Sequence, residues 1–303
     1  MSRTFWDSVT VVGCGLIGAS FALALKRAGA CRRVAGWDTE ASALEGALKV
    51  GAIDEVDEAF ARGTVSRADL VYLAAPVGQI VEHLRGRARQ FKPGAVVTDA
   101  GSTKAEVCRA AREQQPRGWR FVGGHPVAGS HLGGASHARE DLFDGAPYVL
   151  TEAEDPAEAE ALGALANTLG LFGARVRVMK PDEHDRALAL VSHLPQLVSC
   201  ALASAVERRA DADSLAGLAG AGYRDTTRLA ASPWGVWRDI LATNAGGVAD
   251  ALDAFIATLA AARDELREHS QGERGAAAEL AATRSLFARA HVNQIKSGEV
   301  IKP

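Results

Sequence analysis

Short apolar runs alternate with longer stretches of helical spacing in the first half of the chain. This alternation, from residue 8 to about residue 150, predicts a parallel sheet that helices cover on both faces. Strands are expected at residues 9–12, 34–37, 70–74, 95–98, 121–122 and 148–150. One more helix is expected over residues 155–169. It is followed by one more strand, over residues 174–179, that could close the edge of this sheet. The pattern favours a doubly wound fold with a ligand crevice at the carboxyl ends of the strands.

The pattern changes after Pro181, where the strand signals stop. From residue 182 to about residue 290 the chain is rich in Ala, Leu, Arg and Glu at helical spacing, which predicts an all-α second domain. We therefore place the domain boundary near residue 180. An α/β domain is expected over residues 1–180 and a helical domain over residues 181–303.

A glycine-rich turn directly follows the first expected strand. It reads Gly13-Cys14-Gly15-Leu16-Ile17-Gly18 and leads into an apolar helix. In a turn of this kind the first glycine permits the tight bend, the second lets the backbone approach a pyrophosphate, and the third lets helix and strand pack closely. The amino end of the helix attracts the phosphates. The sequence thus predicts a Rossmann-type, mostly parallel α/β domain that binds a dinucleotide.

Asp38 stands twenty residues after Gly18, at the end of the second expected strand. Its carboxylate can accept hydrogen bonds from an adenosine ribose and would repel a 2′-phosphate, so NAD is favoured over NADP. Asp38 could also cap the helix that starts near Thr39, because Asp is a preferred N-cap residue, and the two roles can coexist. Arg32 and Arg33 lie close by in the sequence and leave NADP as the alternative cofactor.

Two further strand ends should face the same crevice. The first carries Ala75 and Pro76, which we expect to form a wall against the nicotinamide ribose. The second carries Ser102 at a helix start, where its hydroxyl can bond a ligand or cap the helix amides. From the local pattern alone, capping is the favoured role of Ser102.

His125 stands between Gly124 and Pro126, after the fifth expected strand, in a segment that we expect to be a loop. A histidine on such a loop titrates near neutrality and can act as a general acid or base. A packing histidine would instead be expected on the apolar face of a regular element. Because catalytic groups concentrate on loops that a rigid scaffold holds, the pattern favours His125 as a catalytic residue.

The helical half holds two more polar motifs. Ser192 and His193 precede Pro195 inside a run of helical apolar spacing, and the proline should interrupt the helix and leave irregular backbone beside them. A structural kink with a packed histidine explains this motif equally well. Farther on, Arg224 and Arg228 lie in a glycine-led turn into a helix, and arginine is the residue type that binds carboxylates bidentately.

Composition and charge narrow the class of protein. The net charge of −3 and the pI near 6.3 provide no basic field for binding nucleic acid. The four cysteines lie far apart in the sequence without a C-x-x-C pair, which suggests neither a zinc ribbon nor a disulfide framework, so we expect reduced, buried thiols. The amino-terminal residues lack the apolar core of a signal peptide, and charges are expected to interrupt the alanine-rich stretches. We therefore expect a cytoplasmic protein without a membrane partner.

Taken together, the motifs resemble those of prephenate and arogenate dehydrogenases, the cyclohexadienyl dehydrogenase family of tyrosine biosynthesis. The resembling segments run in order from residue 9 to about residue 239: Gly-Cys-Gly-Leu-Ile-Gly-Ala-Ser, Asp-Ala-Gly-Ser-Thr-Lys, Gly-Gly-His-Pro-Val-Ala-Gly-Ser, Ser-His-Leu-Pro-Gln and Tyr-Arg-Asp-Thr-Thr-Arg. The resemblance implies NAD-dependent oxidative decarboxylation of prephenate to 4-hydroxyphenylpyruvate, or of arogenate to tyrosine, with no metal ion. It also implies a homodimer formed through the helical domain.

The resemblance assigns roles residue by residue. His125 corresponds to the histidine that draws the proton from the substrate 4-hydroxyl, and Ser102 to the serine that orients that hydroxyl and the nicotinamide. Arg228 corresponds to the arginine that binds a substrate carboxylate. The other substrate-binding positions implied are Ser130, Ser192, His193, Gln196, Asp225 and Trp237.

Two positions depart from the common pattern of that family. His131 stands where an acidic residue is frequent, and Gln196 stands where a second histidine is frequent. A neutral amide binds a carboxylate more weakly than a protonated imidazole does. The resemblance therefore leaves the preference between prephenate and arogenate open.

Two other classes of protein share part of the pattern. A β-hydroxyacid dehydrogenase also joins a Rossmann domain to helices, but its proton acceptor is a lysine of the helical domain, and residues 182–207 contain no lysine. A protein that binds a dinucleotide without catalysis would leave His125 unexplained. Both classes are less consistent with the motifs than a prephenate or arogenate dehydrogenase.

Overall fold

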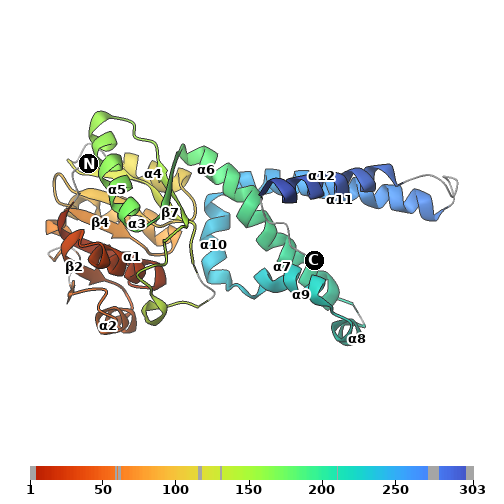
Figure 1. The fold of residues 1–303 in the computed structure, drawn as a ribbon, viewed down its shortest axis with the longest axis horizontal. Coiled ribbons are helices and arrows are strands. Elements are labelled where there is room, and N and C mark those ends of the chain that lie inside the picture. Colours follow the sequence, from red (N-terminus) through yellow and green to blue (C-terminus); the bar gives the residue numbers. More distant parts are fainter. Residues whose placement is uncertain are drawn as a thin grey trace. The chain divides into compact units, whose positions relative to one another are not determined.

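The computed structural model describes residues 5–58, 60, 63–114, 118–129, 132–209, 211–271 and 280–297 (Figure 1). Its contacts divide the chain into two compact units, Met1–Ala245 and Gly246–Pro303. This division falls later in the chain than the predicted boundary near residue 180, because the first helices after the sheets pack into the same unit as the sheets. The boundary near residue 180 stays a prediction.

A six-stranded sheet forms the centre of the first unit, in the order β3-β2-β1-β4-β5-β6, and all its paired strands are parallel. The chain leaves β1 toward one half of the sheet and returns at β4 to build the other, which creates the crevice where doubly wound sheets bind ligands. The strands are β1 (Trp6–Val12), β2 (Cys31–Trp37), β3 (Glu55–Val56), β4 (Leu70–Leu73), β5 (Val96–Asp99) and β6 (Arg120–Val122).

Helices cover both faces of this sheet, as the alternation in the sequence predicted (Figure 1). Val11 and Tyr72 contribute to one hydrophobic cluster, whereas Val12 and Leu73 contribute to the other, because successive side chains of a strand point to opposite faces. The first cluster includes residues of α1 and α5, and the second includes residues of α3 and α4. The helices of this region are α1 (Leu16–Arg27), α2 (Ala41–Lys49), α3 (Val77–Arg87), α4 (Ala105–Arg112) and α5 (Pro156–Leu171).

A second, three-stranded sheet was not predicted. It consists of β7 (Gly124–Pro126), β8 (Pro147–Thr151) and β9 (Arg175–Met179), in that order, with β7 antiparallel to β8 and β8 parallel to β9. The expectation that residues 148–150 and 174–179 extend the main sheet is therefore wrong. The backbone turns at Gly123, whose carbonyl accepts a hydrogen bond from the Thr151 amide at 2.8 Å, so β8 pairs with β7 instead of β6.

The first unit continues with a series of helices after β9. They are α6 (Pro181–Leu188), a π-helical turn η4 (Ala189–His193), α7 (Leu194–Glu207), α8 (Ala212–Gly217), α9 (Ala221–Thr227), a 3-10 turn η5 (Arg228–Ala231) and α10 (Trp234–Thr243). Pro195 lies in the first turn of α7, where its missing amide hydrogen costs nothing. The irregular backbone predicted before Pro195 is confirmed, because the helix widens to a π turn there.

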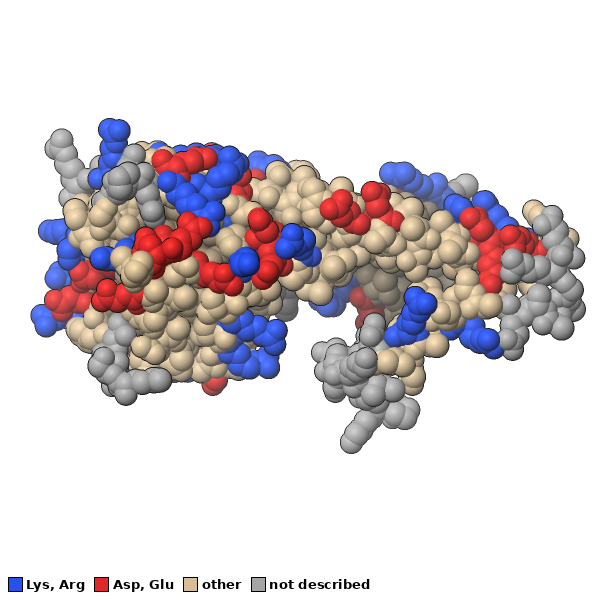
Figure 2. Space-filling model, turned by 90° about the horizontal axis from the view of Figure 1, so that it is seen from above, with Lys and Arg blue, Asp and Glu red and all other residues tan. Residues whose placement is uncertain are grey.

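The second unit contains α11 (Ala245–Ser270) and α12 (Ala281–Ser297). The Glu265 carboxylate accepts hydrogen bonds from the backbone amides of Ala282 at 3.0 Å and Thr283 at 2.9 Å, so α11 caps the amino end of α12. Large apolar side chains remain exposed on these helices, namely Ile256, Leu259, Leu266, Phe287 and Val292. In Figure 2 uncharged surface is extensive, and charges of both signs lie side by side elsewhere on the face shown.

Two helical stretches of the described chain, Pro181–Glu207 and Ala245–Ser270, are long and apolar enough to cross a membrane by length and composition alone. The expectation that charges interrupt every such stretch is wrong for residues 187–206, which contain no Asp, Glu, Lys or Arg. Length and composition are weak evidence of a membrane span. Within Pro181–Glu207 the side chains of His184, Asp185 and His193 are buried and hydrogen-bonded inside the first unit, as a helix of a folded domain requires.

All four cysteines are free thiols. Cys14 and Cys108 are buried as expected, whereas Cys31 and Cys200 are only half-buried. Burial raises the pKa of Cys14 and of Cys108 to about 12, and that of Cys31 to about 11. These three thiols are therefore protonated and unreactive at neutral pH.

Candidate active site

The glycine turn follows β1, and its three glycines meet different surroundings. Gly13 has a φ of 96°, and a Cβ there would lie 2.6 Å from the backbone of Ala74. A Cβ at Gly18 would lie 1.9 Å from the carbonyl oxygen of Gly13. A Cβ at Gly15, in contrast, would meet nothing within 4 Å. Protein therefore packs against the first and third glycines, while the second faces open space that a pyrophosphate could occupy.

The amino end of α1 has polar groups available for that pyrophosphate. Gly15 is its N-cap residue, no side chain caps the helix, and the first turn contains no acidic residue. Leu16 begins the helix and Ile17 follows, so the backbone amides of this turn are available to an anion. The residues at the carboxyl edge of β1 thus fit a dinucleotide.

Asp38 follows β2 and connects it to the glycine turn. Its carboxylate accepts hydrogen bonds from the backbone amides of Cys14 at 2.7 Å and Glu40 at 2.9 Å. The alternative that Asp38 caps the next helix is wrong, because α2 begins at Ala41 and Glu40 is its N-cap residue. The carboxylate is instead held beside the turn, where an adenosine ribose is expected.

Arg32 and Arg33 lie at the other end of β2. Arg32 forms an ion pair with Asp7 at 3.3 Å, and Arg33 forms one with Glu55 at 3.6 Å. Five residues of extended chain separate Arg33 from Asp38, which places the two roughly 15 Å apart along the strand. These arginines are therefore engaged far from the position where a 2′-phosphate would bind.

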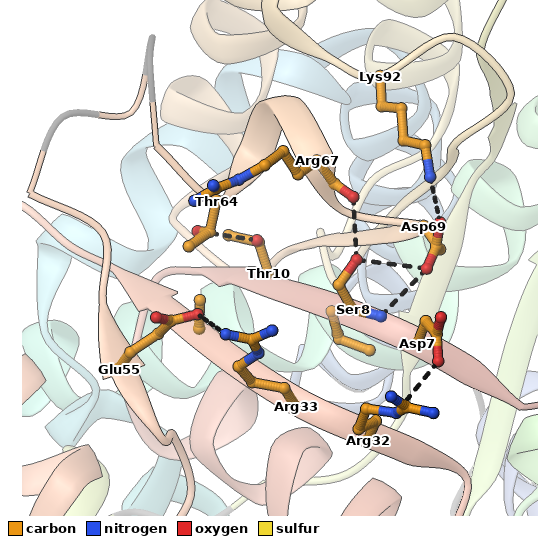
Figure 3. Close-up of a pocket in the computed structure, with 12 residues that line it drawn as sticks. Asp7, Ser8, Thr10, Arg32, Arg33, Glu55, Thr64, Arg67, Asp69 and Lys92 are labelled. Atoms are coloured by element: carbon orange, nitrogen blue, oxygen red, sulfur yellow. Dashed lines mark hydrogen bonds and ion pairs between the residues drawn. The ribbon is translucent and has the colours of Figure 1, made fainter.

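Both arginines border a cavity of about 360 Å³ beside the amino-terminal halves of β1 and β2, away from the glycine turn. Figure 3 shows three of its cations directed toward carboxylates. The ion pairs there are Arg32–Asp7, Arg33–Glu55 and Lys92–Asp69. These pairs neutralise three of the cations that border the cavity, and Arg67, which also lines it, has no ion pair among the described residues. Because the glycine turn lies at the other end of the strands, we assign the active site to the carboxyl edge of the sheet.

Ala75 and Pro76 lie between β4 and α3, as expected. The backbone of Ala74 and Ala75 packs against Gly13, and Pro76 is the N-cap residue of α3. The amide of Ala100, after β5, donates to the carbonyl of Leu73 at 2.9 Å. The ends of β1, β4 and β5 therefore meet at one edge, where the cofactor is expected.

His125 lies on strand β7, not on the loop that was predicted. Its ring is buried, with 7% of the residue exposed, and its Nδ1 lies 2.8 Å from Nε2 of His184 on α6. His184 in turn places its Nδ1 2.8 Å from Oδ1 of Asp185. Within the described part of the chain, Nε2 of His125 has no hydrogen-bond partner, so it is the ring atom available to a substrate.

Burial holds the pKa of His125 well below its ordinary value, and the positive charges that His184, Lys104 and His193 can carry lower it further. The imidazole is therefore neutral at physiological pH. A neutral histidine with a free nitrogen can accept a proton. This electrostatic environment suits a general base.

Asp185 joins this histidine pair to the loop after β5. Its two carboxylate oxygens accept hydrogen bonds from the backbone amides of Lys104 at 2.7 Å and Ala105 at 2.9 Å. The favoured role of Ser102 as a helix cap is thus wrong, since α4 begins at Ala105 and Asp185 satisfies its first amides. The hydroxyl of Ser102 has no partner among the described residues, and it is free to bond a ligand.

A buried ion pair fixes the strand that carries His125. Lys104 and Asp99 are both fully buried, and the Lys104 ammonium donates to the Asp99 carboxylate and, at 2.7 Å, to the Gly124 carbonyl. Asp99 also accepts the Gly124 amide at 3.0 Å and the Gly101 amide at 2.8 Å. The pair therefore ties both polar groups of the Gly124 backbone to the end of β5, next to His125.

His193 and Trp237 lie close to the same cluster. His193 is buried, and its Nδ1 lies 3.3 Å from the side-chain nitrogen of Asn244, which donates to the Asp185 carbonyl at 2.7 Å. The ring centroids of His193 and Trp237 are 6.0 Å apart. Burial is the main reason that the pKa of His193 is lowered, and the nearby Asp185 opposes this shift.

Gln196 is buried on α7 and contacts the turn that contains Arg228. Its amide nitrogen donates to the Leu229 carbonyl at 2.8 Å and approaches the Cys200 sulfur at 3.4 Å, while its carbonyl oxygen is buried without a partner. Ser199 accepts the Ala230 amide at 3.0 Å. Helix α7 thus holds η5 in place, and the Gln196 oxygen is a buried acceptor with no partner in the described chain.

The remaining predicted substrate residues are exposed or undescribed. Ser192 is half-buried, and Arg228 and Asp225 are exposed; in the described chain their side chains have no hydrogen bond or ion pair. Arg224 donates to the Ala219 carbonyl at 2.6 Å. Ser130 and the neighbouring His131 lie outside the described residues. In the described chain no hydrogen bond or ion pair joins Arg228 or Asp225 to His125.

Sequence reasoning missed His184, Asp185, Asp99 and Lys104. Asp99 and Lys104 lie in a motif that was recognised, but no charge pattern showed that both would be buried. His184 and Asp185 lie at the start of a polar helix, and their spacing matches no catalytic motif. Partners on distant elements give these four residues their roles.

A parallel sheet with a dinucleotide turn, beside a buried neutral histidine, defines a nicotinamide-dependent oxidoreductase. Models of two domains match this chain: the nucleotide-binding domain of prephenate dehydrogenase over residues 21–178, and the dimerization domain of prephenate dehydrogenase over residues 180–280. The chain therefore belongs to the prephenate dehydrogenase family.

Individual relatives agree with this membership. A prephenate dehydrogenase of Bacillus subtilis is 36% identical over 272 residues, which cover 88% of this chain and 71% of that protein. The crystal structure of Synechocystis arogenate dehydrogenase has a TM-score of 0.77 and 30% identity, covering 96% of this chain and 99% of that one. A prephenate dehydrogenase of Aquifex aeolicus, solved with hydroxyphenyl propionate and NAD+, has a TM-score of 0.83 and 28% identity, covering 96% of this chain and 98% of that one.

Proposed function

We propose that this enzyme catalyses the NAD-dependent oxidative decarboxylation of prephenate to 4-hydroxyphenylpyruvate in tyrosine biosynthesis. The observation that carries the proposal is the buried, neutral His125, whose Nε2 has no partner among the described residues while its Nδ1 is bound to His184 at 2.8 Å. Membership of the prephenate dehydrogenase family supports the same reaction. So does the likeness to a relative solved with both NAD+ and a hydroxyphenyl acid.

The chain's own residues supply binding, orientation and proton transfer. NAD, when bound, supplies the hydride acceptor. The turn of Gly13, Gly15 and Gly18 holds the pyrophosphate, and Asp38 binds the adenosine ribose, which favours NAD over NADP because a 2′-phosphate would meet the carboxylate. Leu16 and Ile17 provide the first helical amides, and Ala75 and Pro76 border the nicotinamide ribose.

Nε2 of His125 takes the proton of the substrate 4-hydroxyl as hydride leaves the ring carbon that bears this hydroxyl. The free hydroxyl of Ser102 orients that group and the nicotinamide. Loss of CO2 aromatises the ring, so the protein needs to position the reactants rather than activate a poor leaving group. A histidine that stays neutral well below its ordinary pKa is ready for this role at physiological pH.

Arg228 binds a substrate carboxylate, since its guanidinium is unpaired in the described chain and can form a bidentate contact. The other proposed substrate contacts are Ser130, Ser192, His193, Gln196, Asp225 and Trp237. Gln196 carries no charge, so it adds little attraction for a carboxylate. Prephenate is the preferred substrate in this proposal, and arogenate, which would give tyrosine directly, is the alternative.

The enzyme is proposed to be a cytoplasmic homodimer. The exposed apolar side chains of α11 and α12 would be costly to leave in water, and a second copy of the chain would cover them. The model that matches residues 180–280 is that of a dimerization domain. Sedimentation of the purified chain should therefore give twice its mass of 31.7 kDa.

Initial rates with prephenate or arogenate, each with NAD or NADP, test the activity. NADH formation should be fastest with prephenate and NAD. Faster turnover of arogenate would favour the alternative substrate. A protein that NAD stabilises against heat, but that forms no reduced cofactor with either substrate, would overturn the proposal in favour of a non-catalytic dinucleotide-binding protein.

A further inference from the structure

His125, His184 and Asp185 form a hydrogen-bonded chain, which we call the relay, and Asp185 is the residue that anchors it. We infer that His184 and Asp185 are positioning residues that fix the tautomer of His125 and spread the charge that it gains. This inference rests on the proposed function, because it assumes that His125 accepts the proton of the substrate hydroxyl. It adds two residues, on a helix after both sheets, to the groups that this reaction needs.

The order of donors in the relay follows from its distances. A carboxylate can only accept, so the Asp185 oxygen at 2.8 Å requires the proton of neutral His184 on Nδ1. Nε2 of His184 is then a lone pair and must accept from Nδ1 of His125, also at 2.8 Å. The proton of neutral His125 therefore resides on Nδ1, and its Nε2 keeps the lone pair that a general base requires.

The carboxylate of Asp185 is itself held firmly. Its oxygens accept the amides of Lys104 and Ala105 at 2.7 and 2.9 Å, and the backbone carbonyl of Asp185 accepts from Asn244. Lys104 is two residues beyond Ser102. The same carboxylate thus fixes both the loop that carries Ser102 and, through His184, the ring of His125. Removing its charge should disturb the two proposed reacting groups together.

Charged and titratable groups face the relay from several elements. Lys104 and Asp99 lie at the end of β5 and the start of α4, and they bond each other. His193 lies on η4 and approaches through Asn244, which carries no charge. Lys104 and Asp99 largely cancel each other's charge. Asp185, which is bonded to His184, is therefore the carboxylate that can balance a positive charge on the histidine pair.

The proton transfer balances without another reactant. The O–H bond of the substrate breaks, and its proton bonds to Nε2 of His125. As His125 becomes positive, its Nδ1 proton can move to Nε2 of His184, which leaves the positive charge next to the Asp185 carboxylate. The electrons of the broken C–H bond leave with the hydride, and those of the broken bond to CO2 complete the aromatic ring. The electrons of the broken O–H bond form a C=O bond as the hydride leaves. When CO2 departs, that oxygen becomes a phenolate and takes the proton back from Nε2 of His125, and the proton shared by the two histidines returns to Nδ1 of His125.

The variants Asp185→Asn and His184→Gln separate positioning from charge transfer. Asparagine cannot balance a positive histidine and can present its NH2 group to His184, so kcat should fall at least about tenfold; an isosteric Asp→Asn change beside a catalytic histidine costs up to about 10⁴-fold in serine proteases. Glutamine at position 184 can still accept the Nδ1 proton of His125 but cannot take up charge, so its kcat should lie between those of Asp185→Asn and wild type. KM for NAD should change by less than about threefold in both, because the glycine turn is untouched.

The pH profile distinguishes a relay from a merely structural contact. With Asp185→Asn the protonated histidine pair loses its counter-charge, so the acid limb of kcat should move to lower pH while the plateau falls. A change in folded fraction alone would lower the plateau without moving the limb. Asp69→Asn is the matched control: Asp69 also accepts a backbone amide, from Ser8 at 3.1 Å, but lies at the opposite end of the sheet, and its variant should keep the wild-type limb and plateau.

Nitrogen NMR of the histidine rings tests the relay without turnover. Both His125 and His184 should show protonated Nδ1 and bare Nε2 in the full-length protein, and Asp185→Asn should disturb this for both rings. A wild-type His125 protonated on Nε2, or wild-type kcat and pH limb in both variants, would overturn the inference. An inactive wild type with the expected tautomers would instead reject the proposed function and leave the relay standing.

Discussion

The relay of His125, His184 and Asp185 and the turn that contains Arg228 are built very differently. The relay is buried, and its members contact one another at 2.8 Å. Arg228 is exposed and, in the described chain, unpaired, although Gln196 and Ser199 hold the backbone that follows it. The contrast shows that packing preorganises the residues that transfer the proton. The Arg228 side chain, which is proposed to bind the substrate carboxylate, must instead lose conformational entropy on binding.

The largest effect is expected at the buried end of this comparison. His125→Asn removes the proton acceptor, and general bases contribute about 10²- to 10⁴-fold, so kcat should fall by that factor with little change in KM. Steady-state kinetics with prephenate and NAD measure it. The exposed His137→Asn serves as the control and should retain wild-type rates.

The pH dependence of kcat in the wild-type enzyme also tests the role of the buried His125. Since the pKa of His125 is held well below its ordinary value, the base is lost only when the pH falls far below about 6.5. The acid limb of kcat should therefore lie below that pH. A limb above about 7 would show that His125 is more exposed to water or to negative charge than the structure indicates.

Lys104→Met should cost about 3–5 kcal/mol of unfolding free energy, because it leaves the Asp99 carboxylate buried without its partner. Denaturant unfolding measures the loss. Lys92→Met removes a half-buried lysine from an ion pair with Asp69 that water still reaches, and should cost less than about 1 kcal/mol. Equal losses in the two variants would contradict the view that burial makes this half of the site rigid.

Arg228→Ala should act on binding rather than on the chemical step. Loss of one charged hydrogen-bond partner is worth about 1.5–3 kcal/mol, so kcat/KM for prephenate should fall roughly 10- to 100-fold, mostly through KM. Arg224→Ala is a suitable comparison, since Arg224 already donates to Ala219. A larger loss for Arg224 than for Arg228 would mean that the carboxylate is bound by the other arginine.

The smallest effect is expected for stability at the exposed turn. Asp225→Ala removes a side chain without partners in the described chain, so the unfolding free energy should change by less than about 0.5 kcal/mol. Thermal unfolding of the apoenzyme is the measurement. A loss above about 1 kcal/mol would show that the turn is packed in solution and would weaken the contrast with the relay.

The sequence by itself determined the features that depend on neighbouring residues. Alternating apolar runs specified the parallel sheet and the helices on its two faces, because side-chain periodicity follows from local backbone geometry. The glycine turn and Asp38 were recognisable because the steric demands of a dinucleotide turn act over a few residues. The interruption before Pro195 was predictable for the same reason, since a proline affects only the adjoining helical turn.

Tertiary structure alone decided how the polar groups meet. His125 and His184 are 59 residues apart in the sequence, and Lys104 and Asp185 are 81 apart. The strand β7 was too short to show a period, so His125 could not be assigned to a buried strand beforehand. Ser102 had the local signature of a cap, yet Asp185 fills that role from another helix. Burial and hydrogen bonding between distant elements set these partners, and no local pattern encodes them.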